Sequence, residues 1–531
     1  MSYVIAYDIG TTGVKTCIFS IDKKIKMISS AFAGYELYIL PGGKAEQDDN
    51  EWWQSMCTTT REALAEANIS ANDIEGISFC AQMQGLVLVD KDGVPVRKPM
   101  SYMDQRATQE IKDGIQDGIK VLGVNVVKLL KSLAITGAAS LSVKDPMWKY
   151  LWVKNNEPEN FSRVYKWLDV KECLINKCTG NFVMTQDSAF ATMLYDSREG
   201  KYVWSKQLCD MFGVDVNHLP DIIKSEDVAG KLTKKAADEL GLVEGIPVFG
   251  GGGDASLIGV GAGAVGIGDT HIYWGTSGWF ETVTDKRTVD AATSMASAIG
   301  AQKGRFNYLG EMETAGKCLQ WVKDHLAIDE IGVYLNKKDV TDLPESEYKS
   351  LYDYLSKTIS EYPAGSNGII FTPWLHGNRC PFEDPYSAGM FFNVKLNSGK
   401  TELIRSVIEG VCYHLRWMLE CGDKKVKSSE SVRFVGGGAL STVTCQILAD
   451  ITGKNIETVP EPQNVGAVGA AAIAALGLGL IEDLDSIKSL IPVISTYTPN
   501  VANKEIYDKM YNVFIRLYDS NKKNFRDLNS L

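Results

Sequence analysis

At 531 residues the chain is too long for one hydrophobic core, so we expect at least two domains. Its 45% hydrophobic and 23% charged residues are typical of a globular protein in water. The 55 Lys and Arg against 66 Asp and Glu give a net charge of −11, which argues against sequence-independent binding to nucleic acid or anionic lipid. The 49 glycines stand out, because many form short runs with Asp, Ser or Thr.

Cysteine and apolar patterns narrow the class further. The eleven cysteines are scattered from Cys17 to Cys445 without a C-x-x-C pair, which argues against a zinc ribbon, a redox dithiol and a disulfide framework. No apolar run approaches the roughly 18 residues that span a membrane, and the run at 1–9 is too short for a secretory signal. We therefore expect a cytoplasmic protein that binds neither nucleic acid nor membrane.

The first half of the chain opens with a predicted β-hairpin. Residues 3–9 and 14–21 have strand composition, and the turn Gly10–Gly13 between them holds two glycines and two threonines. A third strand is predicted near 27–33, and a helix at 48–67 begins with acidic residues. Helix and strand signals then alternate to about residue 245, with strands near 74–80, 86–90 and 164–169 and helices at 146–154 and 205–212.

The pattern restarts in the second half. A strand at 247–249 leads into Gly250–Asp254, and strands at 270–274 and 279–283 form a second hairpin around Gly275–Gly278. Further helices are predicted at 315–325, 399–421, 441–452, from 466 and at 503–524, and further strands at 432–435 and 455–459. This restart predicts a duplicated α/β nucleotide-binding fold with domains at 1–249 and 250–531 and a hinge at the junction.

The first glycine run carries the chemistry of a phosphate site. Asp8 ends the first predicted strand, and Gly10–Gly13 and Lys15 follow. Glycines let backbone N–H groups face a ligand, while hydroxyls and an amine add donors, which suits a phosphate chain with its divalent cation. The run is not a Walker A loop, because G-x-x-x-x-G-K-[ST] is missing and no helix follows. A purely structural hairpin tip is the alternative.

Three further positions complete the pattern. Gly275–Gly278 is a second tip, and Gly436–Gly438 joins a strand to a helix, where backbone can pack against adenine or simply allow close helix packing. Asp254 follows four glycines at the junction of the halves. A carboxylate there can accept the proton of a substrate hydroxyl in phosphoryl transfer, and a helix N-cap is its alternative role.

These motifs, taken in order, resemble the FGGY carbohydrate kinases and, within them, the xylulose kinases. The similar stretches are D-I-G-T-T-G-V-K (8–15), A-E-Q-D (45–48), Q-M-Q-G-L-V-L-V-D (82–90), M-D-Q-R-A (103–107), G-G-G-D (251–254), G-T-S-G (275–278), A-G-K-C-L-Q-W (315–321), L-I-R-S-V-I-E-G (403–410) and G-G-G-A-L-S (436–441). The resemblance implies a two-domain, actin-like sugar-kinase (ribonuclease H-like) α/β fold with an interdomain cleft. It also implies ATP and Mg²⁺ as cofactors and phosphorylation of a terminal hydroxyl of a small sugar, with D-xylulose first.

The resemblance implies roles for individual residues as well. Asp254 is implied to be the general base and Asp8 the Mg²⁺ ligand. The residues implied to bind nucleotide are Thr11, Thr12, Lys15, Thr276, Gly316, Gln320, Gly438 and Thr442. The residues implied to bind the sugar are Met83, Gln84, Asp104 and Arg106, beside Asp254.

The chain departs from the xylulose-kinase pattern where the sugar is bound. Gln84 stands in place of the histidine of Q-M-H-G, Tyr102-Met103 in place of the Trp-Asn of W-N-D-Q-R, and Ala255 in place of Asn. Glutamine does not titrate near neutrality, and the lost amides are donors with which a site rejects analogues. Asn393 replaces a glycine of the family signature.

Several other functions stay open. Kinases of L-ribulose, erythritol or an aldonate would share the chemistry, whereas a glycerol kinase needs Arg and Glu where Met83 and Gln84 stand. An actin-like or heat-shock-type ATPase module would need a polymer interface or a peptide-binding domain. A sensor would bind sugar without turnover. The expected partner is a small sugar or polyol, and a homodimer is left open.

Overall fold

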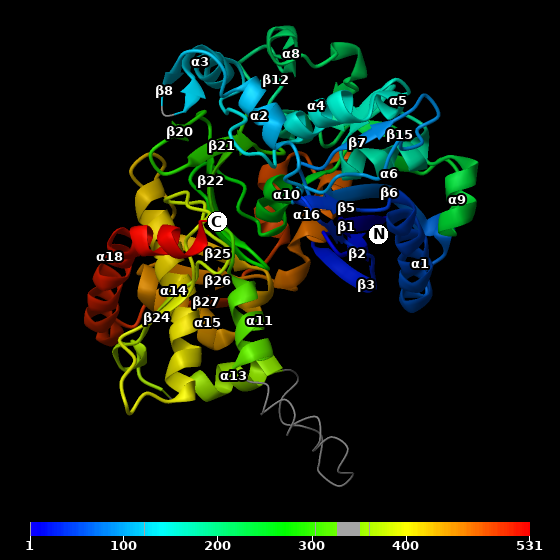
Figure 1. Cartoon of the computed structure of the whole chain (residues 1–531). Helices are drawn as coiled ribbons and strands as arrows, with labels where there is room; N and C mark the ends of the chain where they lie inside the picture. The colour runs from blue at the N-terminus through cyan, green and yellow to red at the C-terminus, as the bar shows by residue number, and fades with distance from the viewer. Residues whose placement is uncertain (1, 122, 303, 327–350, 361, 531) are drawn as a thin grey trace.

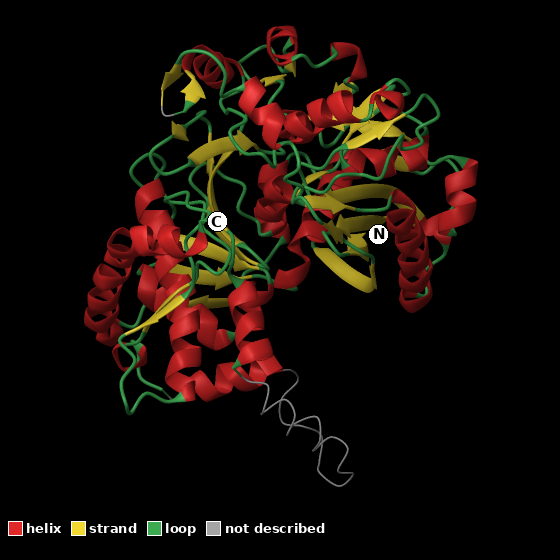
Figure 2. Cartoon of the chain, in the orientation of Figure 1, coloured by secondary structure: helices red, strands yellow, loops and turns green. Residues whose placement is uncertain are grey.

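Two mixed β-sheets with surrounding helices form the two lobes of the molecule (Figures 1 and 2). The computed structural model describes residues 2–121, 123–302, 304–326, 351–360 and 362–530. In the first lobe the strand order is β15-β16-β6-β1-β2-β3, and β17 pairs with β6 as well. The strands are β1 (Ser2–Ile9), β2 (Gly13–Ile21), β3 (Ile25–Gly34), β6 (Ile74–Ala81), β15 (Val228–Lys231), β16 (Pro247–Phe249) and β17 (Gly252–Gly253).

The second sheet repeats the plan of the first, in the order β20-β21-β22-β19-β18-β25-β26-β27. Its strands are β18 (Thr270–Trp274), β19 (Gly278–Thr284), β20 (Val289–Asp290), β21 (Met295–Ile299), β22 (Phe306–Met312), β25 (Ser431–Val435), β26 (Asn455–Thr458) and β27 (Ser495–Tyr497). In each sheet the first hairpin strand, β1 or β18, runs antiparallel to the next strand and parallel to a later one, β6 or β25. Both predicted hairpins are therefore present.

Helices cover both sheets. They are α1 (Asp49–Ala67), α2 (Thr108–Gly114), α3 (Val126–Ile135), α4 (Pro146–Asn156), α5 (Pro158–Phe161), α6 (Val170–Thr179), α7 (Gln186–Ala191), α8 (Lys206–Phe212), α9 (Lys234–Leu240), α10 (Asp254–Gly261), α11 (Gly316–His325), α13 (Leu351–Ser360), α14 (Lys400–Gly422), α15 (Thr442–Thr452), α16 (Val465–Gly477), α17 (Ile487–Leu490) and α18 (Lys504–Asn529). Asp48 caps α1 by accepting a hydrogen bond from the Asn50 N–H at 3.0 Å, as its acidic start predicts.

Short two-stranded ribbons complete the fold. They pair β4 (Tyr38–Leu40) with β5 (Lys44–Glu46), β7 (Val87–Val89) with β10 (Lys166–Leu168), β8 (Lys120–Val121) with β9 (Val124–Asn125), β11 (Val183–Thr185) with β14 (Asp221–Ile223), β12 (Tyr195–Asp196) with β13 (Val203–Trp204), and β23 (Ile370–Thr372) with β24 (Met390–Phe392). All eleven cysteines are free thiols. Across the described part of the chain, no helix has the length and apolar character needed to cross a bilayer.

The helices α10 and α16 pack against each other between the two sheets (Figure 1). Their backbones approach closely because glycines stand at the contact. A Cβ on Gly261 would lie 1.8 Å from the carbonyl oxygen of Val465, and one on Gly469 would lie 2.2 Å from that of Leu257. A glycine is required at both positions. Residues of α16 thus join the core of the first sheet, although they lie late in the sequence.

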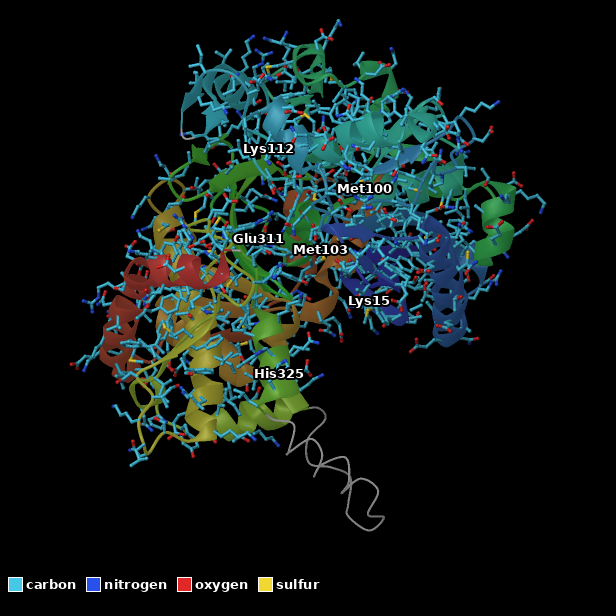
Figure 3. The ribbon with its side chains drawn as sticks, in the orientation of Figure 1. Lys15, Met100, Met103, Lys112, Glu311 and His325 are labelled. Atoms are coloured by element: carbon cyan, nitrogen blue, oxygen red, sulfur yellow. The ribbon has the colours of Figure 1, made fainter. Side chains whose placement is uncertain are left out.

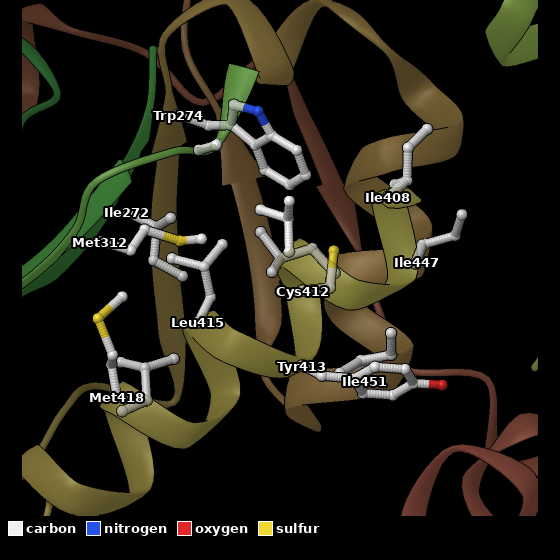
Figure 4. Close-up of a cluster of buried hydrophobic side chains, with 14 of the residues drawn as sticks. Ile272, Trp274, Met312, Ile408, Cys412, Tyr413, Leu415, Met418, Ile447 and Ile451 are labelled. Carbon is white, nitrogen blue, oxygen red and sulfur yellow. The ribbon is translucent and has the colours of Figure 1, made fainter. Parts of the chain in front are cut away.

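The largest core of the second lobe lies between its sheet and the helices α14 and α15. Figure 4 shows Ile272 and Trp274 of the sheet facing Cys412, Leu415 and other buried residues of these helices. Burial of this apolar surface holds the second sheet in place. It thereby also positions the turns that follow the carboxyl ends of the parallel strands. In the first lobe, β17 lies beyond the boundary predicted at residue 250, so the first sheet extends past that point.

Candidate active site

The carboxyl ends of three neighbouring parallel strands bring the predicted catalytic residues to one edge of the first sheet. The register pairs Asp8 of β1 with Cys80 of β6, and Cys80 in turn with Gly252 of β17. Asp8, the segment Gln82–Gln84 and Asp254 therefore leave the sheet at the same edge. This edge is where ligands bind in open α/β sheets.

Asp254 is the first residue of α10, and Gly253 is its N-cap, so the predicted capping role for Asp254 is wrong. Desolvation raises the pKa of Asp254 to about 7, and the negative charges of Glu311 and Asp8 act in the same direction. The backbone N–H of Ala255, which donates to Asp254 Oδ1 at 2.8 Å, opposes them. A carboxylate with this pKa is suited to accept a proton at neutral pH.

The backbone beside Asp254 is held by Asp187 of α7. One carboxylate oxygen of Asp187 accepts hydrogen bonds from the Gly253 N–H at 2.7 Å and the Ser256 hydroxyl at 2.6 Å. Burial alone would raise the pKa of Asp187, but the Lys171 ammonium and these donors lower it below its ordinary value. Sequence reasoning missed Asp187, because an acidic residue in the first turn of a helix is common and gave no separate signal.

The segment after β6 packs directly against the loop before Asp254. A Cβ on Gly253 would lie 2.0 Å from Met83 Sδ, so a side chain at this position would displace Met83 from the loop. Gln84 adopts φ 64°, in the left-handed region. Its carbonyl oxygen accepts a hydrogen bond at 2.9 Å from the buried Lys149, which also donates to the Ser101 carbonyl at 2.8 Å. Lys149 therefore joins two segments that sequence reasoning assigned to the sugar pocket.

Two of the predicted sugar-binding residues are engaged with each other. Asp104 is buried and accepts from Arg106 at 2.7 and 3.0 Å and from the Ala45 N–H at 2.8 Å. Arg106 also pairs with Glu46 at 2.6 Å and stacks over Trp152 at 4.9 Å. These contacts order the segment around Met103, and direct sugar contact by Asp104 and Arg106 stays a prediction.

The first glycine tip lies beside Asp8. In the hairpin register Lys15 stands opposite Asp8, and its ammonium donates to Asn464 Oδ1 at 2.6 Å and to the Gln463 carbonyl at 3.2 Å. Desolvation raises the pKa of Asp8, whereas Lys15 and the Cys80 thiol lower it. Thr12 is exposed, and the Thr11 hydroxyl lies 3.4 Å from that of Tyr102.

The second tip is docked onto the start of α11. The Gly316 N–H donates to the Gly275 carbonyl at 2.8 Å, and the Ala315 N–H donates to the Thr276 carbonyl at 3.1 Å. Gly438 lies against the indole of Trp274, at the end of the neighbouring parallel strand. Thr276, Gly316 and Gly438 are thereby brought to one edge of the second sheet. Thr276, Gln320 and Thr442 are exposed.

Four charged residues at this site were not predicted from the sequence. Glu311 forms an ion pair with Arg379, which also lies 3.3 Å from Glu313 through Nε. Glu313 reaches Lys144 of the first lobe at 3.7 Å. In Figure 3, Glu311 and Met103 lie between the two lobes. One signal for the two glutamates was available in the sequence. They stand two residues apart at the end of a strand, and this spacing places both side chains on one face of the sheet.

No group of three or more His, Cys, Asp or Glu side chains within the described ranges is arranged to hold a metal ion. Mg²⁺ commonly takes only one or two protein carboxylates and fills its other positions with phosphate and water. Asp8, partly exposed beside the first glycine tip, offers such a ligand.

Comparison with known proteins identifies the family of the chain. Residues 3–261 match the N-terminal domain model of the FGGY family of carbohydrate kinases, and residues 271–478 match its C-terminal domain model. The chain belongs to the FGGY family of carbohydrate kinases.

Relatives of this FGGY kinase carry different substrate names. A xylulose kinase of Staphylococcus epidermidis is 28% identical over 526 residues, covering 99% of this chain and 98% of the relative. A gluconokinase of Bacillus subtilis is 26% identical over 531 residues, covering 97% and 95%. The ligand-bound structure of a xylulose kinase from Lactobacillus acidophilus has a TM-score of 0.85 at 24% identity, covering 99% of this chain and 100% of the other. The predicted two-domain sugar-kinase fold is confirmed, whereas the substrate is not decided at these identities.

Proposed function

We propose that this FGGY kinase transfers the γ-phosphate of ATP to a terminal hydroxyl of a small sugar, with D-xylulose as the first candidate. The observation that carries the proposal is Asp254, whose pKa is raised to about 7 at the edge shared by Asp8 and the Gln82–Gln84 segment. The names of the xylulose kinase relatives support the choice of sugar. We infer that the domains 1–249 and 250–531 close around this edge.

In this proposal, the proton of the sugar hydroxyl passes to Asp254 as its oxygen attacks phosphorus. The backbone N–H groups of the two glycine tips, with Thr11, Thr12, Lys15 and Thr276, hold the phosphates in line with the hydroxyl. Phosphoryl transfer depends mainly on such positioning and on charge neutralisation. Asp8 would hold Mg²⁺, which when bound supplies positive charge to the phosphates. Met83 packs on Gly253 and so fixes the acceptor loop against the base.

The test is acceptor-dependent ADP release by the wild type and by Asp254→Asn. Loss of the base lowers the rate by about 10²–10⁴-fold. Asp285→Asn is the matched control, because Asp285 is an exposed aspartate away from the site. Equal rates for wild type and Asp254→Asn would refute the assigned base. Sugar binding without sugar-dependent ADP release would point instead to a sensor.

A further inference from the structure

Four charged side chains form a group that spans the two lobes, and we call it the four-charge group: Lys144, Glu311, Glu313 and Arg379. Arg379 pairs with both glutamates, and Lys144 lies 3.7 Å from Glu313. Between 21% and 34% of each side chain is exposed, so the group is open to a ligand rather than sealed in a core. The two cations in this group are each already engaged by a carboxylate.

The four-charge group borders the segments assigned to the acceptor, because Lys144 lies just before α4, and Lys149 of α4 donates to the Gln84 and Ser101 carbonyls. Glu311 belongs to β22, in register with Trp279 of β19, the strand that leaves the second glycine tip. The negative charge of Glu311 contributes to raising the pKa of Asp254. The negative charges of both glutamates contribute to raising the pKa of Tyr102. The Tyr102 hydroxyl lies 3.4 Å from that of Thr11. Tyr102 and Met103 begin the Y-M-D-Q-R segment assigned to the sugar pocket.

The charges here discriminate between two classes of acceptor. An aldonate carries a carboxylate that must displace Glu311 or Glu313 from Arg379 or Lys144, or else lie beside them unpaired. Like charges brought together at an interface are strongly unfavourable, and such a repulsive element is a common source of specificity. The hydroxyls of a neutral sugar or polyol instead donate hydrogen bonds to carboxylates, which only accept.

We propose that Glu311 and Glu313, by occupying Arg379 and Lys144, make this kinase select an uncharged polyhydroxy acceptor and reject aldonates. The inference rests on the proposed sugar-kinase function and names its acceptor class. The glutamates act as specificity determinants, and neither of them accepts the proton, which is assigned to Asp254.

Xylitol and D-xylonate test the inference, because they differ only in a CH₂OH or carboxylate group at one end. For the full-length wild type, kcat/KM for xylitol exceeds that for D-xylonate by about tenfold or more. Glu313→Gln removes the carboxylate partner of Lys144 and one of the two carboxylate partners of Arg379. It therefore narrows the ratio by about fivefold or more, chiefly by lowering KM for D-xylonate. Glu383→Gln, an exposed glutamate on the segment that carries Arg379, leaves the ratio unchanged.

Calorimetric binding of the same two compounds without nucleotide separates this inference from the proposed function. Selective xylitol binding without ADP release would refute the kinase function and support the selectivity. Equal or tighter binding of D-xylonate by the wild type, binding of neither compound, or an unchanged ratio in Glu313→Gln would overturn the selectivity. Glu313→Gln keeps the Glu311–Arg379 pair, and its thermal unfolding checks that the fold persists.

Discussion

The two sides of the proposed site are built in different ways. The nucleotide side, formed by the tips Gly10–Gly13 and Gly275–Gly278 and the turn Gly436–Gly438, presents backbone between packed strands and helices. The acceptor side, formed around Met83, Gln84, Tyr102 and the four-charge group, consists of side chains from both lobes. Backbone donors suit phosphate, which every ATP-dependent kinase binds, whereas side chains can change with the acceptor.

This difference explains where the chain departs from the xylulose-kinase pattern. The contact of the second tip with α11 leaves no room for a side chain at Gly316, because a Cβ there would lie only 2.4 Å from the Gly275 carbonyl oxygen. On the acceptor side, Gln84 and Met103 replace family residues without breaking a backbone contact of this kind. We therefore expect the departures to affect the choice of acceptor and to leave the phosphate chemistry in place.

The largest effect is expected when a substitution disrupts the nucleotide side alone. Gly316→Ala forces α11 away from the second tip, because the new Cβ would lie 2.4 Å from the Gly275 carbonyl oxygen. A displacement of this size lowers kcat/KM for ATP by about 10²-fold. Steady-state kinetics with ATP varied would measure the loss. Gly304→Ala, where a Cβ meets nothing within 4 Å, is a glycine control, although its φ of 73° gives it some strain of its own. An unchanged kcat/KM for ATP in Gly316→Ala would contradict the docking role.

A smaller effect is expected when the support of Asp254 is loosened. Asp187→Asn weakens the hydrogen bonds to the Gly253 N–H and the Ser256 hydroxyl, which hold the loop before the base. We expect kcat to fall about tenfold while KM for ATP stays within about twofold. Asp210→Asn on the exposed face of α8 serves as the control. A purely structural role would instead lower the thermal stability and leave kcat per folded molecule unchanged.

The pH dependence sharpens the link between Glu311 and the base. Asp254 accepts a proton only when ionised, and its pKa is raised from 3.8 to about 7. Activity is therefore present above about pH 7, and kcat/KM falls as the pH drops through this value. Glu311→Gln removes a negative charge that raises this pKa, so the midpoint moves to lower pH. Glu383→Gln is the control, and we expect its midpoint to match that of the wild type. An unchanged midpoint in Glu311→Gln would show that Glu311 and Asp254 are not coupled.

The smallest effect is expected at Asn393, a departure away from the acceptor side. Asn393 adopts φ 67°, the left-handed conformation that glycine and asparagine tolerate best, and donates to the Gly368 carbonyl at 2.9 Å. Asn393→Ala lowers the free energy of unfolding by about 1–2 kcal/mol. Asn393→Gly changes it by about 0.5 kcal/mol or less. Urea unfolding measures both, and a change in acceptor preference in either variant would contradict the separation of this residue from the site.

Much of the fold was predictable because the signals are local. Alternation and Gly/Thr turns located both hairpins, and the acidic residues at its start located the beginning of α1 to within one residue. The 3₁₀ turn at 437–440 displaced the start of α15 to Thr442, one residue beyond the prediction. Asp187 and Lys149 gave no signal, because their role depends on backbone groups brought to them from 66 and 65 residues away along the chain.

The sequence by itself determined the repeated hairpins, the glycine tips and the family, since each of these is written in short contiguous motifs. Only the tertiary structure decided that Asp8 and Asp254 leave one sheet edge and that Asp187 fixes the loop beside the base. It also decided that Arg379 and Lys144 are already paired with Glu311 and Glu313. Charges act through space rather than along the chain, so the acceptor side exists only once the two lobes are assembled.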